Sequence, residues 1–583
     1  MKSNRFIQEK KSEKTMSYSS RFWKKNWDSG VEDLDPKEFE TTYPEWIKDT
    51  FKDYPDKISL EYLGVEITFK QVDEYSNQFA NMLIDNGFKK GDVVGINLPN
   101  SPQYVIAVVG TLKAGCIVSG VSPLLSAVQI QYQINDLGSG GKQVALITLD
   151  AIFAGHIVKI AETMPQLKLV IATNVADFLP KIKQVLGKAL GKVPKGKVTP
   201  LPGKKVLDFM KDVIGKYPTD PVNVDLTPDD IGWIQYTGGT TGPPKGAMLS
   251  HRNCVSNMKS IIAWLQWERG KGILCSGFPY FHIAGLTVCE SALSAGFGQL
   301  VIPNPRDTDH IVKVMDKYHA TNLVNVPSLY QLLIKNPKFK VIDHSELGTC
   351  VSAASPFPKE SQVELESIIG KGKLLELYGM TELSPVATMN PSLGKKQLGT
   401  VGLPIQNVEL KLVDPETNKE VPLGEPGEIC VRGPLVMKEY YNKPEETKKA
   451  IDQDGFMHSG DVGVMAEDGY IKIVDRTKDM LIVGGYKVFS AKVEDTLSQH
   501  PAIGIIALIG EPNPDRPGSE IVNAYIQLDP DFQYDGNEEK LKEEITSFAK
   551  ENCAPYEVPK KIHIMKELPL TAVGKIDKKL LRK

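Results

Sequence analysis

Short apolar segments alternate with helically spaced segments along most of this 583-residue chain. Alternation at this spacing indicates β–α–β units and mainly parallel sheets. The expected strands are 58–62, 65–69, 92–98, 116–121, 144–148, 231–234, 272–278, 322–326, 349–354 and 374–377. The helically spaced segments include 43–51, 71–86, 102–114 and 250–262. The sequence therefore predicts an α/β fold.

The chain is too long for one hydrophobic core, so at least two folding units are expected. Beyond Gly399 the pattern changes to short β segments separated by turns, which predicts a β-rich subdomain over about 399–476. The sequence pattern of the last hundred or so residues is typical of a small α+β domain, which includes a hairpin around Gly484. We predict an N-terminal tail (1–42) that partly docks on the body, a large domain of two α/β subdomains plus the β-rich one (43–476), and a C-terminal domain (477–583).

Composition limits the class of protein. Lys and Arg number 69 against 72 Asp and Glu, a formal net charge of −3, which argues against nucleic-acid binding. The seven cysteines are scattered and never form a CxxC pair, which favours free thiols in a reducing cytoplasm and argues against a zinc site. No secretory signal opens the chain, and Lys113 and several glycines interrupt its most apolar stretch, 104–121. We expect a soluble cytoplasmic protein.

A loop rich in glycine and threonine, Tyr236–Gly246, follows one of the expected strands. Glycines let backbone N–H groups approach a ligand, threonines add hydroxyl donors, and Lys245 supplies a point charge suited to phosphate. Ser250 is the predicted N-cap of the helix that follows. The loop is not a P-loop, because Gly246 rather than Ser or Thr follows the lysine. Alone, it also fits an ordinary surface loop.

Four further polar clusters lie where strands are expected to end or turn, which is where open α/β sheets bind ligands. Each also fits a turn, a helix cap or a surface ion pair. They are 352–356, 378–382, 458–461 together with 475–479, and 569–575.

The segment between Phe178 and Asp208 contains eight lysines and no acidic residue. Leu179, Ile182, Val185 and Leu186 are helically spaced within it, which predicts a basic amphipathic helix. It fits either a solvated helix and loop or peripheral contact with anionic lipid.

Taken together and in this order, the loop and the four clusters resemble the AMP-forming adenylate ligases, which include acyl-CoA synthetases, peptide-synthetase adenylation domains and luciferases. The resemblance covers the chain from about residue 40. It is strongest to medium- and long-chain fatty-acyl-CoA ligases, because of Gly238 and the lysine-rich insert. It implies ATP/AMP, Mg²⁺ and coenzyme A as cofactors, a small carboxylic acid as substrate, and a C-terminal domain that is mobile.

The resemblance also implies roles for single residues. The β- and γ-phosphates would be held by Thr237, Gly239, Thr240, Thr241 and Lys245. Mg²⁺ would be held by Glu382 with Thr237, and the α-phosphate by Thr381. Adenine would stack on Tyr378 against Ser352, Ala353, Ala354, Ser355 and Pro356, in a nucleotide site completed by Glu376, Leu377, Gly379 and Met380. The ribose would be held by Asp461 with Arg476.

Lys575 would be the catalytic lysine, Lys478 would be the hinge, and Gly485 and Lys487 would face coenzyme A. His282 would lie near the acyl carboxylate, although a structural role fits as well. Candidates for the acyl pocket, several of which could be core, are Ile283, Gly285, Leu286, Val326, Met380, Leu383 and Val386. Ser459 is a mild departure from the family pattern. Ser490 and Lys492 replace its proline and glutamate after the hairpin, so the resemblance does not define the details of the surface that faces coenzyme A.

The expected activity is an acyl-CoA ligase for a medium- or long-chain fatty acid, or for an aromatic or alicyclic acid, in a reaction that is chemically reversible. The alternatives are an acyl-AMP ligase that loads a carrier protein, a non-catalytic nucleotide or lipid sensor, and a kinase that would release ADP. The sequence leaves open whether the protein is a monomer or a homodimer.

Overall fold

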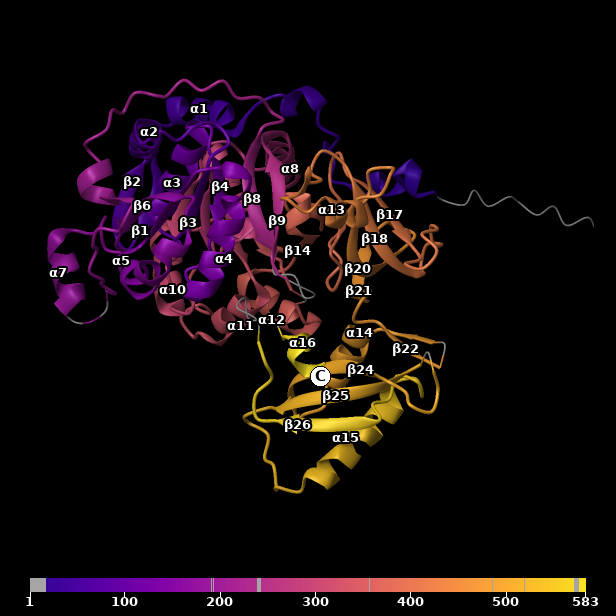
Figure 1. Ribbon diagram of the computed structural model, residues 1–583. Coiled ribbons are helices and arrows are strands. Elements are labelled where there is room, and N and C mark those ends of the chain that lie inside the picture. The colour runs from indigo at the N-terminus through magenta and orange to yellow at the C-terminus, as the bar shows by residue number, and fades with distance from the viewer. Residues whose placement is uncertain are drawn as a thin grey trace, which may run out of the picture.

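The computed structural model describes residues 17–582 except 190, 192, 238–242, 356, 485, 518 and 571–575. A large body carries the N-terminal and central segments, and a smaller α+β unit lies beside one end of it (Figure 1). The prediction of a mixed α/β fold is confirmed. No helix within the described ranges is long and apolar enough to cross a bilayer.

The first sheet of the body is parallel in its centre, from β4 through β7, and antiparallel at the edge formed by β8, β9 and β19. Its strands in spatial order are β19 (Glu439–Tyr440), β9 (Lys245–Ser250), β8 (Ile231–Thr237), β4 (Ile117–Gly120), β3 (Val93–Asn97), β5 (Val144–Leu149), β6 (Leu167–Thr173) and β7 (Lys205–Asp208). The strand β19 comes from far along the chain, so it brings a distant segment to the edge next to the Gly/Thr loop.

The second sheet is also parallel in its centre and antiparallel at its edges. Its strands in spatial order are β16 (Leu403–Pro404), β15 (Val386–Met389), β14 (Leu374–Gly379), β13 (Thr349–Ser352), β12 (Asn322–Asn325), β10 (Ile273–Ser276), β11 (Gly298–Val301), β1 (Ile58–Tyr62) and β2 (Val65–Thr68). The short helix η8 (Thr381–Leu383) follows β14 and lies against β8 and β9 of the first sheet.

The helices of the body bury the two sheets. They are α1 (Tyr43–Asp53), α2 (Phe69–Asp85), α3 (Pro102–Lys113), α4 (Ala127–Leu137), α5 (Asp150–Ile152), α6 (Val158–Ile160), α7 (Lys181–Ala189), α8 (His251–Trp264), α9 (Ile283–Ser294), α10 (Thr308–Tyr318), α11 (Pro327–Lys335), α12 (Lys359–Ile369) and α13 (Pro444–Ala450). α3 and α9 are buried along nearly their whole length, as expected of helices that are apolar on every side. The predicted N-cap Ser250 is confirmed, since its hydroxyl accepts from the Asn253 amide.

The β-rich region is an antiparallel sheet in the order β17 (Glu409–Val413), β18 (Pro426–Arg432), β20 (Met457–Met465) and β21 (Ile471–Arg476). The cluster 458–461, predicted at a strand end or turn, lies in the first half of β20, where the register is irregular: His458 pairs with Cys430 of β18 and Asp461 with Arg476 of β21. As expected, part of the N-terminal tail docks on the body. Trp27 packs edge-on against Trp264, and Trp23 is fully buried.

The smaller unit contains the expected hairpin and a three-stranded sheet with helices packed on it. Its elements are β22 (Leu481–Val483), β23 (Tyr486–Val488), α14 (Ser490–Leu497), β24 (Ile503–Pro512), β25 (Glu520–Leu528), α15 (Glu538–Asn552), β26 (Lys561–Met565) and α16 (Lys578–Leu581). It has its own core, in which Leu508, Ile526 and Ile545 are buried. The sequence analysis did not anticipate β26 or α4. The boundary at residue 477 stays a prediction.

Candidate active site

Lys245 begins β9 opposite Thr237, the last residue of β8, so the Gly/Thr loop spans the end of this hairpin. Gly239, Thr240 and Thr241 lie outside the described residues. The Lys245 ammonium lies 2.6 Å from Glu446 Oε2 and 4.9 Å from the centre of the Tyr440 ring. The ammonium group of Lys245, which the sequence analysis assigns to phosphate, is therefore held over the Tyr440 ring by the Glu446 carboxylate on α13.

Glu382 lies at the hydroxyl end of the same side chain, Tyr440. The Tyr440 hydroxyl donates to Glu382 Oε1 at 2.6 Å, and the carboxylate is only 5% exposed. Burial raises the pKa of Glu382, whereas the Tyr440 hydrogen bond and the Lys245 charge lower it. Thr381, its neighbour in η8, is also buried. Lys245, Tyr440 and Glu382 thus form a continuous chain of contacts between the two sheets.

This cluster has the donor chemistry that Mg²⁺ requires. Mg²⁺ prefers oxygen ligands, and Glu382 and Thr237 supply a carboxylate and a hydroxyl from adjacent elements. A divalent cation would also favour the ionised form of a carboxylate whose burial raises its pKa. The two residues fit the ion that the sequence analysis assigned to them.

Each carboxylate oxygen of Asp461 has a side-chain partner. The Tyr378 hydroxyl donates to Asp461 Oδ2 at 2.7 Å, and Arg476 Nε lies 3.1 Å from Oδ1. Burial, and next the charge of Asp461, raises the pKa of Tyr378, which therefore stays a neutral donor. Ser459 accepts from the Asp461 amide at 3.1 Å, so serine supplies the hydroxyl where the family pattern has threonine. Residues from β14, β20 and β21 meet here.

The small-residue segment 352–355 follows β13, beside β14. Ala353 is buried, Ala354 has a φ of 75°, and Ser352 Oγ is buried without a hydrogen-bond partner among the described residues. Ser355 is exposed, and Pro356 lies outside the described residues. A buried, unpaired hydroxyl at a strand end can take a ligand hydrogen bond.

The β14 residues assigned to the nucleotide differ in their exposure. Glu376 turns inward, accepts from Gln362 Nε2 at 2.8 Å, and has its pKa raised to about 7 by burial. Leu377 and Met380 are half-buried, and a Cβ on Gly379 would overlap the Pro385 carbonyl. Close packing therefore requires glycine at position 379. The Glu376 side chain could contact the nucleotide only if it left Gln362.

The link between body and smaller unit carries several charged contacts. Burial, followed by the Arg476 charge, lowers the pKa of Lys478 to about 8, and Arg582 donates to the Lys478 carbonyl at 3.3 Å. Lys487 of the hairpin pairs with Asp414 at the end of β17, 2.9 Å away. In this orientation Lys487 therefore binds the β-rich sheet. Gly485 and Lys575 lie outside the described residues.

Comparison with known proteins decides the family. The model of the AMP-binding enzyme family matches residues 47–441, and that of the AMP-binding enzyme C-terminal domain matches residues 492–575. The chain belongs to the AMP-binding enzyme family. This confirms the resemblance that the ordered motifs suggested, and with it ATP/AMP as the nucleotide.

Relatives align over nearly the whole chain. A long-chain-fatty-acid–CoA ligase of Escherichia coli O6:H1 is 35% identical, covering 91% of this chain and 92% of its own. One of Bacillus subtilis strain 168 has the same identity and coverages. Among solved structures, the anthranilate CoA ligase AuaEII in complex with anthranoyl-AMP has a TM-score of 0.78 at 26% identity, covering 94% of this chain and 98% of that one. ATP-bound MatB from Rhodopseudomonas palustris has a TM-score of 0.75 at 26% identity, covering 93% and 98%.

His282, which the sequence analysis places near the acyl carboxylate, caps α9. Its Nδ1 accepts from the Ala284 amide at 3.2 Å, which supports the structural interpretation. The neighbouring loop is tightly packed, because a Cβ on Gly120 would overlap the Phe281 carbonyl. A contact between His282 and the acyl carboxylate stays a prediction.

Most acyl-pocket candidates are core residues. Ile283, Leu286, Leu383 and Val386 are at most 4% exposed, and a Cβ on Gly285 would overlap the Pro279 carbonyl. Two candidates keep exposed surface and can line a pocket, namely Val326 and Met380.

The sequence analysis missed Tyr440 and Glu446. Glu446 lies 201 positions after Lys245, in a segment with neither a glycine cluster nor clear periodicity. Only the pairing of β19 with β9 brings that segment to the loop. Tyr440 and Glu446 could have been found from sequence only by predicting this two-residue edge strand.

Proposed function

We propose that this AMP-binding enzyme is an AMP-forming acyl-CoA ligase whose leading substrate is a long-chain fatty acid. The observation that carries the proposal is 35% identity to long-chain-fatty-acid–CoA ligases across both the large and the C-terminal region. The polar site supports it, because Lys245, Glu382 and Asp461 are each held by a hydrogen bond or an ion pair. Anthranilate and related aromatic acids are the second candidates, since a neighbour of similar fold acts on anthranilate.

In the first half-reaction a carboxylate oxygen attacks the α-phosphorus of ATP, and pyrophosphate leaves with the electron pair of the broken P–O bond. Lys245 exchanges Glu446 for the β- and γ-phosphates, while Thr381 donates to the α-phosphate. Asp461, fixed by Tyr378 and Arg476, accepts from the ribose hydroxyls. Bound Mg²⁺ would supply charge neutralisation to the polyphosphate at Glu382. Such preorganised charges lower the cost of bringing two anions together.

In the second half-reaction the thiolate of coenzyme A attacks the acyl carbon, and AMP leaves as the acyl–phosphate bond breaks. Lys575 assists the first step, and rotation about Lys478 brings the hairpin with Lys487 toward the acyl-adenylate for the second. For this rotation Lys487 has to leave Asp414, and Arg582 has to leave the Lys478 carbonyl. Both contacts are partly exposed, so breaking them costs little.

Peripheral contact with anionic lipid belongs to this proposal. α7 exposes Ile182, Val185 and Leu186 at 75%, 67% and 54%, on a segment that carries lysines and no acidic residue. An exposed apolar face flanked by lysines is suited to the headgroup region of a membrane that holds fatty acids. A solvated helix is the alternative.

The decisive experiment is a screen of nucleotide products with palmitate, octanoate, benzoate and anthranilate, with and without coenzyme A. Release of AMP and pyrophosphate, with consumption of coenzyme A and a preference for palmitate, is the expected result. Consumption of ATP to acyl-AMP without consumption of coenzyme A would favour the carrier-loading alternative. ADP as product would favour a kinase, and no turnover with any acid would favour a sensor.

A further inference from the structure

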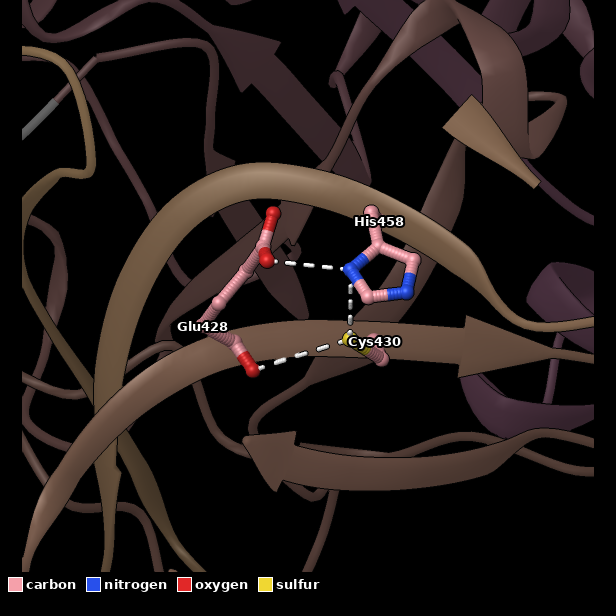
Figure 2. Close-up of side chains that lie close together, drawn as sticks. All are labelled: Glu428, Cys430 and His458. Carbon is pink, nitrogen blue, oxygen red and sulfur yellow. Dashed lines mark hydrogen bonds and ion pairs between the residues drawn. The ribbon is translucent and has the colours of Figure 1, made fainter. Parts of the chain in front are cut away.

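Three side chains with metal-binding groups meet on the β-rich sheet, away from the Lys245 cluster. Cys430 on β18 pairs directly with His458 on β20, and Glu428 lies two residues before Cys430 on the same face of its strand. Figure 2 shows the carboxylate, the thiol and the imidazole converging on one point. Cys430 and His458 are register partners, and the register of the two strands shifts between Cys430 and Glu428.

The spacing of the donor atoms suits one small cation. Glu428 Oε2 lies 3.0 Å from His458 Nδ1, Cys430 Sγ lies 3.4 Å from the same nitrogen, and the three donor atoms lie within 4.8 Å of one another. Donors bound to a tetrahedral zinc ion at about 2.0–2.3 Å are separated by roughly 3.2–3.8 Å. Closing around such an ion therefore needs only side-chain adjustments.

Without a cation these groups satisfy each other poorly. Nδ1 carries either a proton or a lone pair, so it cannot donate to Glu428 and also accept from the Cys430 thiol. The thiol is left with a long contact to the Glu428 carbonyl, 3.8 Å away. A cation would accept one lone pair from each of the three groups, which removes this conflict.

We propose that Glu428, Cys430 and His458 bind one divalent transition-metal ion of the zinc class. Thiolate and imidazole ligands select such ions over Mg²⁺, so this site is distinct in chemistry from Glu382. Glu428 and His458 are 12% and 19% exposed, which leaves an entry path and room for a water ligand. The carboxylate and the thiolate together balance the charge of the ion.

The surroundings supply a partner for the other ring nitrogen. Asp452 Oδ2 lies 3.7 Å from His458 Nε2, and a carboxylate in this place fixes the ring orientation of a metal-binding histidine. Lys411 lies 3.9 Å from Asp452 and over the Phe456 ring, which offsets part of the negative charge. The absence of a CxxC pair argued against zinc, but here the register of two strands unites ligands 28 positions apart.

The site shares strand β20 with Asp461, because His458 lies on the same strand. Glu428 Oε1 accepts from the Gly460 amide at 2.9 Å, and Gly460 precedes Asp461. A cation bound by the Glu428 carboxylate would therefore affect the position of Asp461. This consequence for nucleotide binding rests on the proposed function, whereas metal binding itself does not.

The test measures metal directly on the full-length, chelator-treated protein in the presence of excess Mg²⁺. We expect about one Zn²⁺ per chain with saturable binding, and Co²⁺ in its place should give a near-ultraviolet thiolate-to-cobalt absorption band. Cys430→Ser should abolish the band, and His458→Gln should weaken zinc binding by roughly 10- to 100-fold or more. The matched control Cys553→Ser, which removes a partly exposed thiol elsewhere, should leave both unchanged.

A Co²⁺ band that survives Cys430→Ser, or one that Cys553→Ser removes, would overturn the proposal, as would the lack of saturable zinc binding. X-ray absorption of the zinc-loaded wild-type protein needs no substitution and guards against a variant that fails to fold. One sulfur and lighter donors around zinc would support the site, and a shell of oxygen and nitrogen alone would refute it.

Discussion

Lys245 and Glu446 form an ion pair with 2.6 Å between Nζ and Oε2, across 201 positions of sequence. Glu446 also pairs with Lys449 at 3.0 Å. The hydrogen bond from Lys245 is the largest cause that lowers the pKa of Glu446 to about 2, so the carboxylate is ionised at neutral pH. ATP must therefore compete with Glu446 for the lysine that is expected to hold its phosphates.

Releasing Lys245 should strengthen ATP binding. Glu446→Gln keeps the size of the side chain and removes its charge, and partly exposed ion pairs contribute up to about 1 kcal/mol. We expect the KM for ATP to fall by about two- to fivefold in steady-state kinetics, with the KM for the acid unchanged. Glu445→Gln is the matched control, because Glu445 pairs with Lys448 and does not touch Lys245. A higher KM for ATP in Glu446→Gln would show that Glu446 orients the lysine instead of competing for it.

The hydroxyl of Tyr378 should have a role separate from that of its ring. Tyr378→Phe keeps the ring and removes only the 2.7 Å hydrogen bond to Asp461, which leaves Arg476 to hold the carboxylate. A hydrogen bond to a charged group is worth about 1.5 kcal/mol or more, so the Kd for ATP should rise roughly tenfold. Isothermal titration with ATP would measure this, and Tyr525→Phe, a tyrosine of the C-terminal sheet, is the control. An unchanged affinity would mean that Arg476 alone positions Asp461.

The parallel sheets and the β8–β9 hairpin could be predicted from sequence, because local patterns determine them. Apolar runs of strand length and the N-cap at Ser250 need no information from elsewhere in the chain. The ordered motifs also named Asp461, Tyr378 and Arg476, which the structure brings into contact. That part of the prediction depended on the order and spacing of the family motifs, and not on local structural preferences.

Contacts that depend on register between distant strands could not be predicted. Tyr440 reaches Glu382 only because β19 adds to β9, and His458 reaches Glu428 only because β20 pairs with β18. The polar residues 458–461, predicted at a strand end or turn, form an irregular stretch of β20 in which Gly460 has a φ of 72°, His458 pairs with Cys430 and Asp461 pairs with Arg476. The pattern of polar residues predicts the irregularity, but it does not predict which distant residues pair there.

Asp475 should make stability depend on pH. Burial raises its pKa to about 6, and its Oδ2 has no hydrogen-bond partner in the described part of the chain. Because the folded state holds this proton more tightly than the unfolded state, the group lowers the free energy of unfolding as pH rises from about 4 to 6, by up to about 1.4 kcal/mol for each pH unit in that interval. Asp475→Asn should therefore raise the melting temperature at pH 7.5 but not at pH 4. Asp531→Asn, at an exposed site, is the control, and an equal change in melting temperature at both pH values would contradict the assignment.

Lys575 should be needed in only one half-reaction. Lys575→Ala should slow acyl-AMP formation by roughly 10²–10³-fold, as removal of one charge-stabilising group does, while attack of coenzyme A on supplied acyl-AMP persists. Rapid-quench assays of each half-reaction would measure this, with the exposed Lys566→Ala as control. Equal losses in both steps would contradict a C-terminal region that changes orientation between them.

The exposed apolar face of α7 should decide whether the protein binds lipid. Ile182→Ser, Val185→Ser and Leu186→Ser together remove apolar surface but keep every lysine of the segment. Burial of such side chains in a membrane contributes about 1.5–3 kcal/mol each, so the triple variant should lose co-sedimentation with vesicles that contain anionic lipid. Wild-type protein should bind these vesicles more strongly than neutral ones, and salt should weaken the binding because part of the attraction is electrostatic. Equal recovery of the wild type with anionic vesicles and without them would leave α7 as a solvated helix.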